Sequence, residues 1–195
     1  MSSNQNSWRI LVAVVTLLTG SVLAVQAALP HGWLLAGTKP SEYEAGVDVD
    51  QIYQGHATAF LKSKTLNTDG FGTLMQSIKA EQYLGRKVRL SGLVKSEEVL
   101  GWAGLWMRVD KEKSMVAFDN MENRAIKGTT GWQRYDIVLD VPKDATAISF
   151  GILLAGSGVV WLNGTKFDVV DADVPVTNTG QKVLPEKPMN LDFAN

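Results

Sequence analysis

The stretch GWAGLWMRVD, residues 101–110, decides the fold class of this chain. One set of alternating residues is apolar: Ala103, Leu105, Met107 and Val109. The residues between them form a second set: Trp102, Gly104, Trp106 and Arg108. Successive side chains of a β-strand point to opposite faces, so this alternation directs one set toward a core and the other away from it. We therefore expect a half-buried strand with Trp106 and Arg108 on its outer face.

The same alternation recurs along most of the chain. Strands are expected at residues 33–37, 43–48, 56–62, 72–80, 88–95, 102–109, 114–119, 134–141, 148–154 and 159–170. The dipeptide Asn163-Gly164 is expected to break the last strand in a hairpin turn, and single helical turns are expected at 80–84 and 96–99. Many short strands separated by turns indicate an all-β fold, here an antiparallel two-sheet β-sandwich of jelly-roll type.

The alternation also predicts the core. The side chains expected on the inward faces are Leu90, Val94, Leu105, Met107, Val109, Ile137, Leu139, Phe150 and Ile152. An error of one residue in the assignment would exchange the inward and outward faces of a strand.

The N-terminal residues 1–27 have the pattern of a signal peptide. Arg9 carries the only charged side chain before an apolar run over 10–25, and Val25-Gln26-Ala27 supplies the small residues of a cleavage site. Cleavage would start the mature chain near Ala28, and export would bring it to a periplasm or the extracellular space, free of the membrane. An uncleaved anchor is the alternative, because the apolar run approaches the roughly 20 residues that span a bilayer.

The composition fits one folded domain after this segment. The chain has 195 residues, of which 45% are hydrophobic and 20% charged, so it can bury a core of its own. We expect a sandwich domain over 28–170 and a polar C-terminal extension over 171–195. The net charge of −1, with both signs interspersed, argues against a nucleic-acid partner. The absence of cysteine excludes disulfides and thiolate metal sites.

Several longer motifs lie in the expected domain: Gly72–Ile78, Arg86–Ser91, Gly101–Asp110, Ala117–Met121, Ile126–Thr130, Trp132–Tyr135 and Phe150–Leu154. Together they resemble a β-sandwich domain found alone or appended to AraC-type bacterial transcription regulators, over about residues 33–176. This resemblance does not imply DNA binding here, because the sequence contains no helix-turn-helix segment and a signal peptide is unexpected on a regulator.

More distantly, the layout is similar to galactose-binding-like carbohydrate-binding modules. The similarity rests on Arg89–Lys95, Trp132–Pro142 and the closing strand Val160–Phe167. Such modules usually carry an Asp-Asp pair in that strand, where this chain has Asn163-Gly164. The resemblance therefore implies a saccharide or similar polar ligand, but no carboxylate-dependent role at these positions.

The candidate ligand site is the outer face of the 101–110 strand. An outward Trp106 can stack on the apolar face of a sugar ring, and Arg108 can donate hydrogen bonds to hydroxyls or a carboxylate. Four more residues are candidates on this face or at its rim: Gln76, Trp102, Asp119 and Asn120. The alternatives are that another segment covers Trp106, and that Asp119 and Asn120 form an Asx-turn at a strand end.

Other chemistry has weaker sequence support. Trp132, Tyr135 and Trp161 are interpreted as structural aromatics. The two histidines, His31 and His56, lack the spacing of a metal site and a nucleophile motif. No cofactor is expected except a structural calcium ion, which galactose-binding-like sandwiches often hold; its candidate ligands here are Asp48, Asp50 and Asp168.

Three functional hypotheses remain from the sequence. The first is an exported, non-catalytic binding module for a carbohydrate or similar small polar ligand, bound on the concave sheet face. The second is an exported, hydrolase-like enzyme that uses the same face. The third is an interaction or scaffold domain of the cell envelope. Aromatic residues without clustered titratable groups favour the first hypothesis.

Overall fold

The computed structural model describes residues 28–66 and 68–177. The expected signal segment and residues 178–195 of the expected extension lie outside the described residues. The described part contains nine strands: β1 (Leu34–Gly37), β2 (Tyr43–Tyr53), β3 (His56–Ser63), β4 (Phe71–Lys79), β5 (Lys87–Lys111), β6 (Ser114–Asp119), β7 (Ile126–Asp140), β8 (Ala147–Ala155) and β9 (Val159–Val170). Short 3-10 helices are η1 (Pro40–Glu42), η2 (Glu81–Tyr83) and η3 (Glu122–Arg124).

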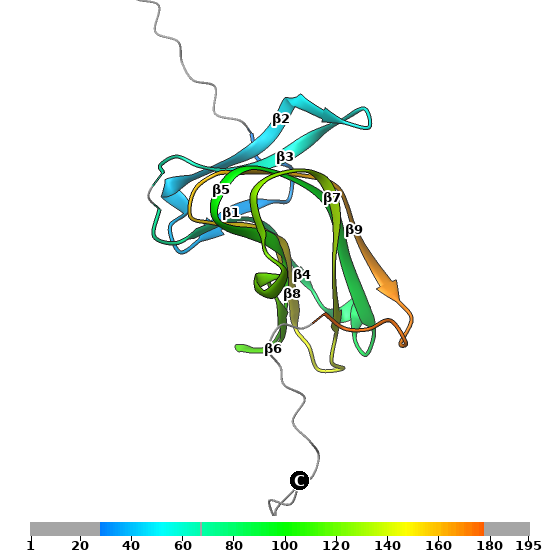
Figure 1. The fold of residues 1–195 in the computed structure, drawn as a ribbon. Helices are drawn as coiled ribbons and strands as arrows, with labels where there is room; N and C mark the ends of the chain where they lie inside the picture. Colours follow the sequence, from blue (N-terminus) through cyan, green and yellow to red (C-terminus); the bar gives the residue numbers. More distant parts are fainter. Residues whose placement is uncertain (1–27, 67, 178–195) are drawn as a thin grey trace, which may run out of the picture.

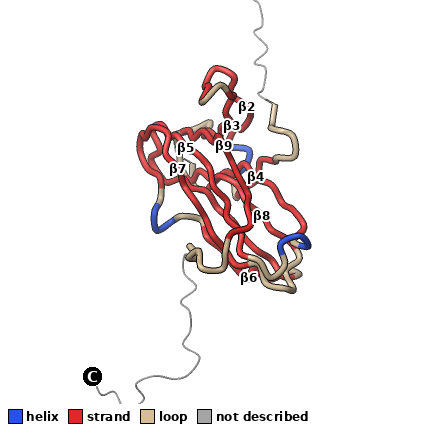
Figure 2. The backbone as a smooth tube through the Cα atoms, turned by 90° about the vertical axis from the view of Figure 1, so that its right-hand side faces the viewer, coloured by secondary structure: helices blue, strands red, loops and turns tan. Residues whose placement is uncertain are grey.

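The long strand β5 belongs to both layers of an antiparallel sandwich (Figure 1). Its N-terminal half pairs with β7 and β9, and its C-terminal half pairs with β8 and β6. We call β1, β4, β8, β6 and the C-terminal half of β5 the β8 sheet. We call β7, the N-terminal half of β5, β9, β3 and β2 the β9 sheet. Figure 2 shows that strands form nearly the whole body, and the predicted all-β sandwich is confirmed.

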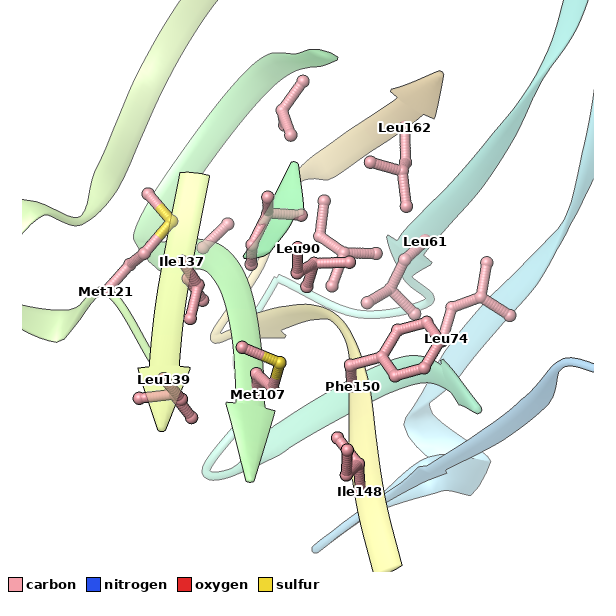
Figure 3. Close-up of a cluster of buried hydrophobic side chains, with 14 of the residues drawn as sticks. Leu61, Leu74, Leu90, Met107, Met121, Ile137, Leu139, Ile148, Phe150 and Leu162 are labelled. Atoms are coloured by element: carbon pink, nitrogen blue, oxygen red, sulfur yellow. The ribbon is translucent and has the colours of Figure 1, made fainter. Parts of the chain in front are cut away.

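The two sheets enclose one apolar core. Figure 3 shows Leu90 and Met107, from the two halves of β5, in one cluster with Ile137 of β7 and Phe150 of β8. The predicted inward residues are all buried in this cluster: Leu90, Val94, Leu105, Met107, Val109, Ile137, Leu139, Phe150 and Ile152. The inward face is therefore as predicted, which determines the outward face as well.

Two local predictions are wrong. The expected helical turn at 96–99 is part of β5, where the pairing with β7 shifts register several times between Val94 and Ala103. Glu98, with φ of 51°, lies in this bend, and bulges of this kind let one strand turn from one sheet into the other. The expected break at Asn163-Gly164 is also a shift in register, because β9 continues to Val170. Pairing with neighbouring strands thus carries both strands through residues typical of turns.

Tyr43 at the start of β2 links separate loops, a role that alternation alone does not reveal. Its ring is buried, and its hydroxyl lies 3.0 Å from the carbonyl oxygens of both Gly70 and Gly156. A side chain at Gly72 would come within 2.4 Å of this ring, so the close contact needs glycine. Burial, with a smaller contribution from Glu42, raises the pKa of the Tyr43 phenol. The contact holds β2 against the end of the β8 sheet.

Candidate functional site

The outer face of the β8 sheet carries the predicted ligand site. Strand pairing sets Trp106 opposite Gly151 of β8, which in turn lies opposite Met75 of β4. In the next outward row, Arg108 lies opposite Ser149 on one side and Phe118 of β6 on the other. The order of strands therefore gathers outward side chains from β4, β5, β6 and β8 on one surface.

Trp106 forms the floor of this surface and does not project from it. Its indole N–H donates a 2.7 Å hydrogen bond to the hydroxyl of Thr73 on β4, so the ring spans β8. Gly151 lies beneath it, and a side chain there would come within 2.2 Å of a backbone oxygen of β4. The Thr73 hydroxyl in turn donates to the carbonyl oxygen of Ile152 at 2.8 Å. Trp106 is only 8% exposed, which corrects the expectation of an exposed stacking platform.

A pocket of about 430 Å³ opens above this floor. This volume lies within the range of roughly 300–1,000 Å³ that is typical of small-molecule sites. The lining is mainly apolar and aromatic, with polar groups at the rim: Ala36, Gly37, Thr38, Phe71, Thr73, Met75, Trp102, Trp106, Arg108, Phe118, Asn120 and Leu153. The pocket thus brings together Trp102, Trp106, Arg108 and Asn120 among the predicted site residues.

Arg108 carries the only charge among the described residues that line this pocket. Its side chain is 45% exposed, and its Nε donates to Asp110 Oδ2 at 3.0 Å. The guanidinium is held from one side in this way, while its Nη groups make no hydrogen bond within the described part of the chain. A single oriented cation thus lies at the edge of an aromatic pocket.

Asp119 is a structural residue. Its carboxylate is fully buried and forms a two-pronged ion pair with Arg124, at 2.7 and 3.1 Å. It also accepts the amide of Met121, and Asn120 accepts the amide of Glu122, so both residues form Asx-turns. The alternative interpretation of Asp119 and Asn120, an Asx-turn at a strand end, is therefore confirmed. Asn120 lines the pocket as well, whereas Asp119 does not.

The placement of Gln76 on the ligand face is wrong. Along β4, Gln76 shares the inward side with Leu74 and Ile78, and its amide nitrogen lies near Gly32. Thr73 and Met75, one residue out of phase with it, face the pocket. Because the side-chain period is two, a residue two positions from core residues shares their inward face and cannot reach the outer face.

Sequence reasoning missed several pocket residues, chiefly Phe71, Phe118 and Met75. Phe118 carries a detectable signal, because its neighbours Ala117 and Asp119 are buried and β6 alternates around it. Phe71 and Met75 become part of the site only because β4 pairs with β8, a contact between residues far apart in the sequence.

The outer face of the β9 sheet has a different character, because the end of β2 lies across it. Asp48 accepts a 2.8 Å hydrogen bond from the Trp161 indole on β9. Farther along β2, Gln51 accepts from Lys95 of β5 at 2.8 Å. The ring centroid of Tyr53 lies 4.7 Å from that of Trp132 on β7.

The three contacts are made to β9, β5 and β7, which are neighbours in the sheet in that order, so the end of β2 runs across all three strands. Figure 1 shows the β2–β3 hairpin at the top of the molecule. The Lys95 ammonium also lies 4.7 Å from the centre of the Trp161 ring. Trp132 and Trp161 therefore serve mainly to hold the hairpin against the sheet.

Asp48 should make the hairpin contact sensitive to acid. Burial raises the pKa of its carboxyl, but hydrogen bonds, chiefly from Trp161, and the nearby Lys95 charge outweigh burial and lower the pKa overall. A lowered carboxyl pKa adds stability above the ordinary value near 4, and this stability is lost as the pH falls through the folded-state pKa. We expect wild type to lose more unfolding free energy than Asp48→Asn between about pH 5 and 2.

Urea unfolding curves at several pH values measure this difference. Asp50→Asn is the control, because its exposed carboxylate has no hydrogen-bond partner within the described residues. Equal acid sensitivity of wild type and Asp48→Asn would show that the contact with Trp161 does not depend on the charge.

The structure does not add support for the calcium site. No three His, Asp or Glu residues come together as a metal site within the described ranges. Asp48 is engaged by Trp161 and by the amides of Asp50 and Gln51, and Asp168 lies opposite Arg89. A calcium ion stays a prediction from the sequence. Likewise, residues 28–66 and 68–177 include no helix long and apolar enough to cross a membrane.

Comparison with known proteins shows sequence similarity to part of a bacterial protein. No model of a known protein family matches this chain. A stretch of 165 residues is 46% identical to part of an uncharacterized HTH-type transcriptional regulator, YbfP, of Bacillus subtilis (strain 168), covering 83% of this chain. The chain spans 56% of that relative's length. The predicted resemblance to a domain found in transcription regulators is confirmed at this coarse level.

Solved structures with the same fold are distant in sequence. The CBM22-1 xylan-binding domain of Paenibacillus barcinonensis Xyn10C is 17% identical, with a TM-score of 0.54 over 75% of this chain and 91% of that domain. A Stig cyclase from Fischerella sp. TAU is 12% identical, with a TM-score of 0.53 over 75% of this chain and 89% of that one. A binding module and an enzyme thus share one architecture. This chain has the sandwich fold of carbohydrate-binding modules, combined with sequence similarity to part of a bacterial regulator.

Proposed function

We propose that this chain is a non-catalytic binding module for a carbohydrate or similar small polar ligand, held on the outer face of the β8 sheet. The observation that carries the proposal is the pocket above Trp106, with aromatic walls from Trp102, Phe71 and Phe118 and a polar group, Arg108, at its edge. A sugar ring has apolar C–H faces that pack on aromatic rings and a hydroxylated rim that needs hydrogen-bond donors. The pocket offers both.

The comparisons support this proposal in two ways. The fold is shared with a xylan-binding domain, so a saccharide ligand is compatible with the architecture. The similarity to part of a regulator fits a module that responds to a small molecule, although the described residues contain only helices of three residues, too short for a DNA-reading helix. Export, as expected from residues 1–27, would bring the pocket to a periplasm or the extracellular space.

Binding is favoured over catalysis because of the chemistry of the lining. General acid–base or nucleophilic chemistry needs titratable or nucleophilic groups positioned together. Among the described residues that line the pocket, Arg108 is the one ionised group, and the hydroxyl of Thr73 is engaged by Trp106 and Ile152. This lining is suited to holding a ligand.

The test is a glycan array on the full chain, followed by calorimetric titration of the hits. Trp102→Ala and Phe118→Ala should each weaken binding by at least about 1 kcal/mol, the scale of an aromatic contact, without unfolding the protein. Both side chains are only half-buried, so their removal leaves the core unchanged. Trp132→Ala is the matched control, because Trp132 is a half-buried tryptophan on the other sheet.

Two outcomes would overturn the proposal. One is that no glycan or small polar ligand binds the wild-type protein. The other is that Trp132→Ala weakens binding as much as Trp102→Ala does, since the β8-sheet pocket would then not be the site.

A further inference from the structure

The charge distribution at the pocket narrows the class of ligand. We infer that the ligand of the β8-sheet pocket is acidic, a uronic acid or a saccharide that contains one, with its carboxylate bound by Arg108; this inference rests on the proposed function. It goes beyond that function because a neutral sugar would need only hydroxyl partners.

The pocket offers few polar partners to a neutral sugar. Neutral sugars bind through many hydrogen bonds, and the described polar lining is sparse. Thr38 already accepts the amide of Phe71, and the Thr73 hydroxyl is engaged on both sides. Asn120 accepts the amide of Glu122. Arg108 keeps the four N–H donors of its two Nη groups, more than any other described side chain that lines the pocket.

The Arg108 guanidinium has a restrained orientation. Asp110 binds Nε of Arg108 at 3.0 Å, and this contact restrains the guanidinium. The two Nη groups, which make no hydrogen bond within the described part of the chain, form a planar fork. Such a fork matches the two oxygens of a carboxylate and binds it more strongly than it binds a hydroxyl.

The charges around the pocket favour an acidic ligand. No carboxylate lines the pocket within the described residues, and the carboxylate of Asp110 pairs with Nε of Arg108 and not with its Nη groups. The aromatic rings of Phe71, Trp102 and Phe118 line the same pocket as Arg108, whose side chain is itself 45% exposed. A ligand carboxylate would thus bind through the two Nη groups of a guanidinium whose charge Asp110 balances in part.

The experiment compares acidic ligands with neutral ones. Calorimetry on the full chain uses glucuronate-substituted xylo-oligosaccharides and their unsubstituted counterparts, together with glucuronic and galacturonic acid. We expect Arg108→Gln to weaken binding of the acidic ligands by roughly 10- to 100-fold, the scale of a lost hydrogen bond to a charged group, and to change neutral binding little. Arg108→Lys keeps the charge but loses the fork, so it should recover only part of the affinity.

Arg134→Gln is a closely matched control. Arg134 also pairs with an aspartate two residues along the same strand, Asp136 at 3.3 Å, and its side chain is 50% exposed, but it lies on the β9 sheet. The inference is supported if Arg108→Gln weakens acidic binding and Arg134→Gln does not. Equal weakening by both variants would overturn it, since the effect would then be one of net charge.

The remaining outcomes separate the inference from the proposed function. If acidic and neutral saccharides bind equally well and Arg108→Gln changes neither, the acidic ligand class is wrong while a saccharide-binding module stands. If neither kind of ligand binds the wild-type protein, the proposed function fails and the inference fails with it.

Discussion

Replacing Trp106 with alanine is expected to lower the free energy of unfolding by about 3–5 kcal/mol. The indole is nearly buried, lies across the glycine position of β8 and joins β5 to β4 through Thr73. Alanine would leave a cavity in the outer layer of the β8 sheet and would remove the donor to the Thr73 hydroxyl. Chemical denaturation of the wild-type and variant proteins, followed by circular dichroism, measures the loss.

A graded variant separates packing from hydrogen bonding. Trp106→Phe keeps an aromatic ring on the floor but loses the N–H donor, so we expect a smaller loss of about 1–2 kcal/mol. If Trp106→Ala cost less than about 1 kcal/mol, the ring would not be the structural floor described here. A large cost would also mean that binding by this variant cannot report on ligand contacts, which is why Trp102 and Phe118 are the better probes.

Replacing Leu105 with alanine is expected to cost about 2–5 kcal/mol of unfolding free energy. Leu105 is fully buried between the two sheets, next to Trp106 in sequence but on the opposite face of β5. The variant loses the transfer free energy of the removed atoms, and the closely packed core can fill the cavity only in part. Thermal and urea unfolding, monitored together, test whether the transition stays cooperative.

Leu100→Ala is the matched control for this variant. Leu100 lies on the same strand, but its side chain is 75% exposed, so its removal should change stability by less than about 0.5 kcal/mol. Similar losses for Leu100→Ala and Leu105→Ala would contradict the assignment of inward and outward faces along β5.

The sequence determined the local properties of this protein. Alternation with a period of two depends only on adjacent residues, and it correctly predicted most strand positions, the β-sandwich class and the inward residues such as Leu105 and Phe150. It also predicted that the side chains of Trp106 and Arg108 point away from the core on the same face of the strand. The strand order of the sandwich cannot be obtained in this way, because sheet pairing joins residues far apart in the chain.

Tertiary structure alone decided what surrounds those outward side chains. Trp106 is a nearly buried floor because β4 lies two strands away and places Thr73 within hydrogen-bonding distance of the indole. Gln76 is not part of the site because the face of β4 that lines the pocket carries Thr73 and Met75. Asp119 became structural because the turn after β6 brings Arg124 to it. Each outcome depends on which strand lies beside which and in what register, since a neighbouring strand decides whether an outward side chain meets solvent, a ligand or another side chain.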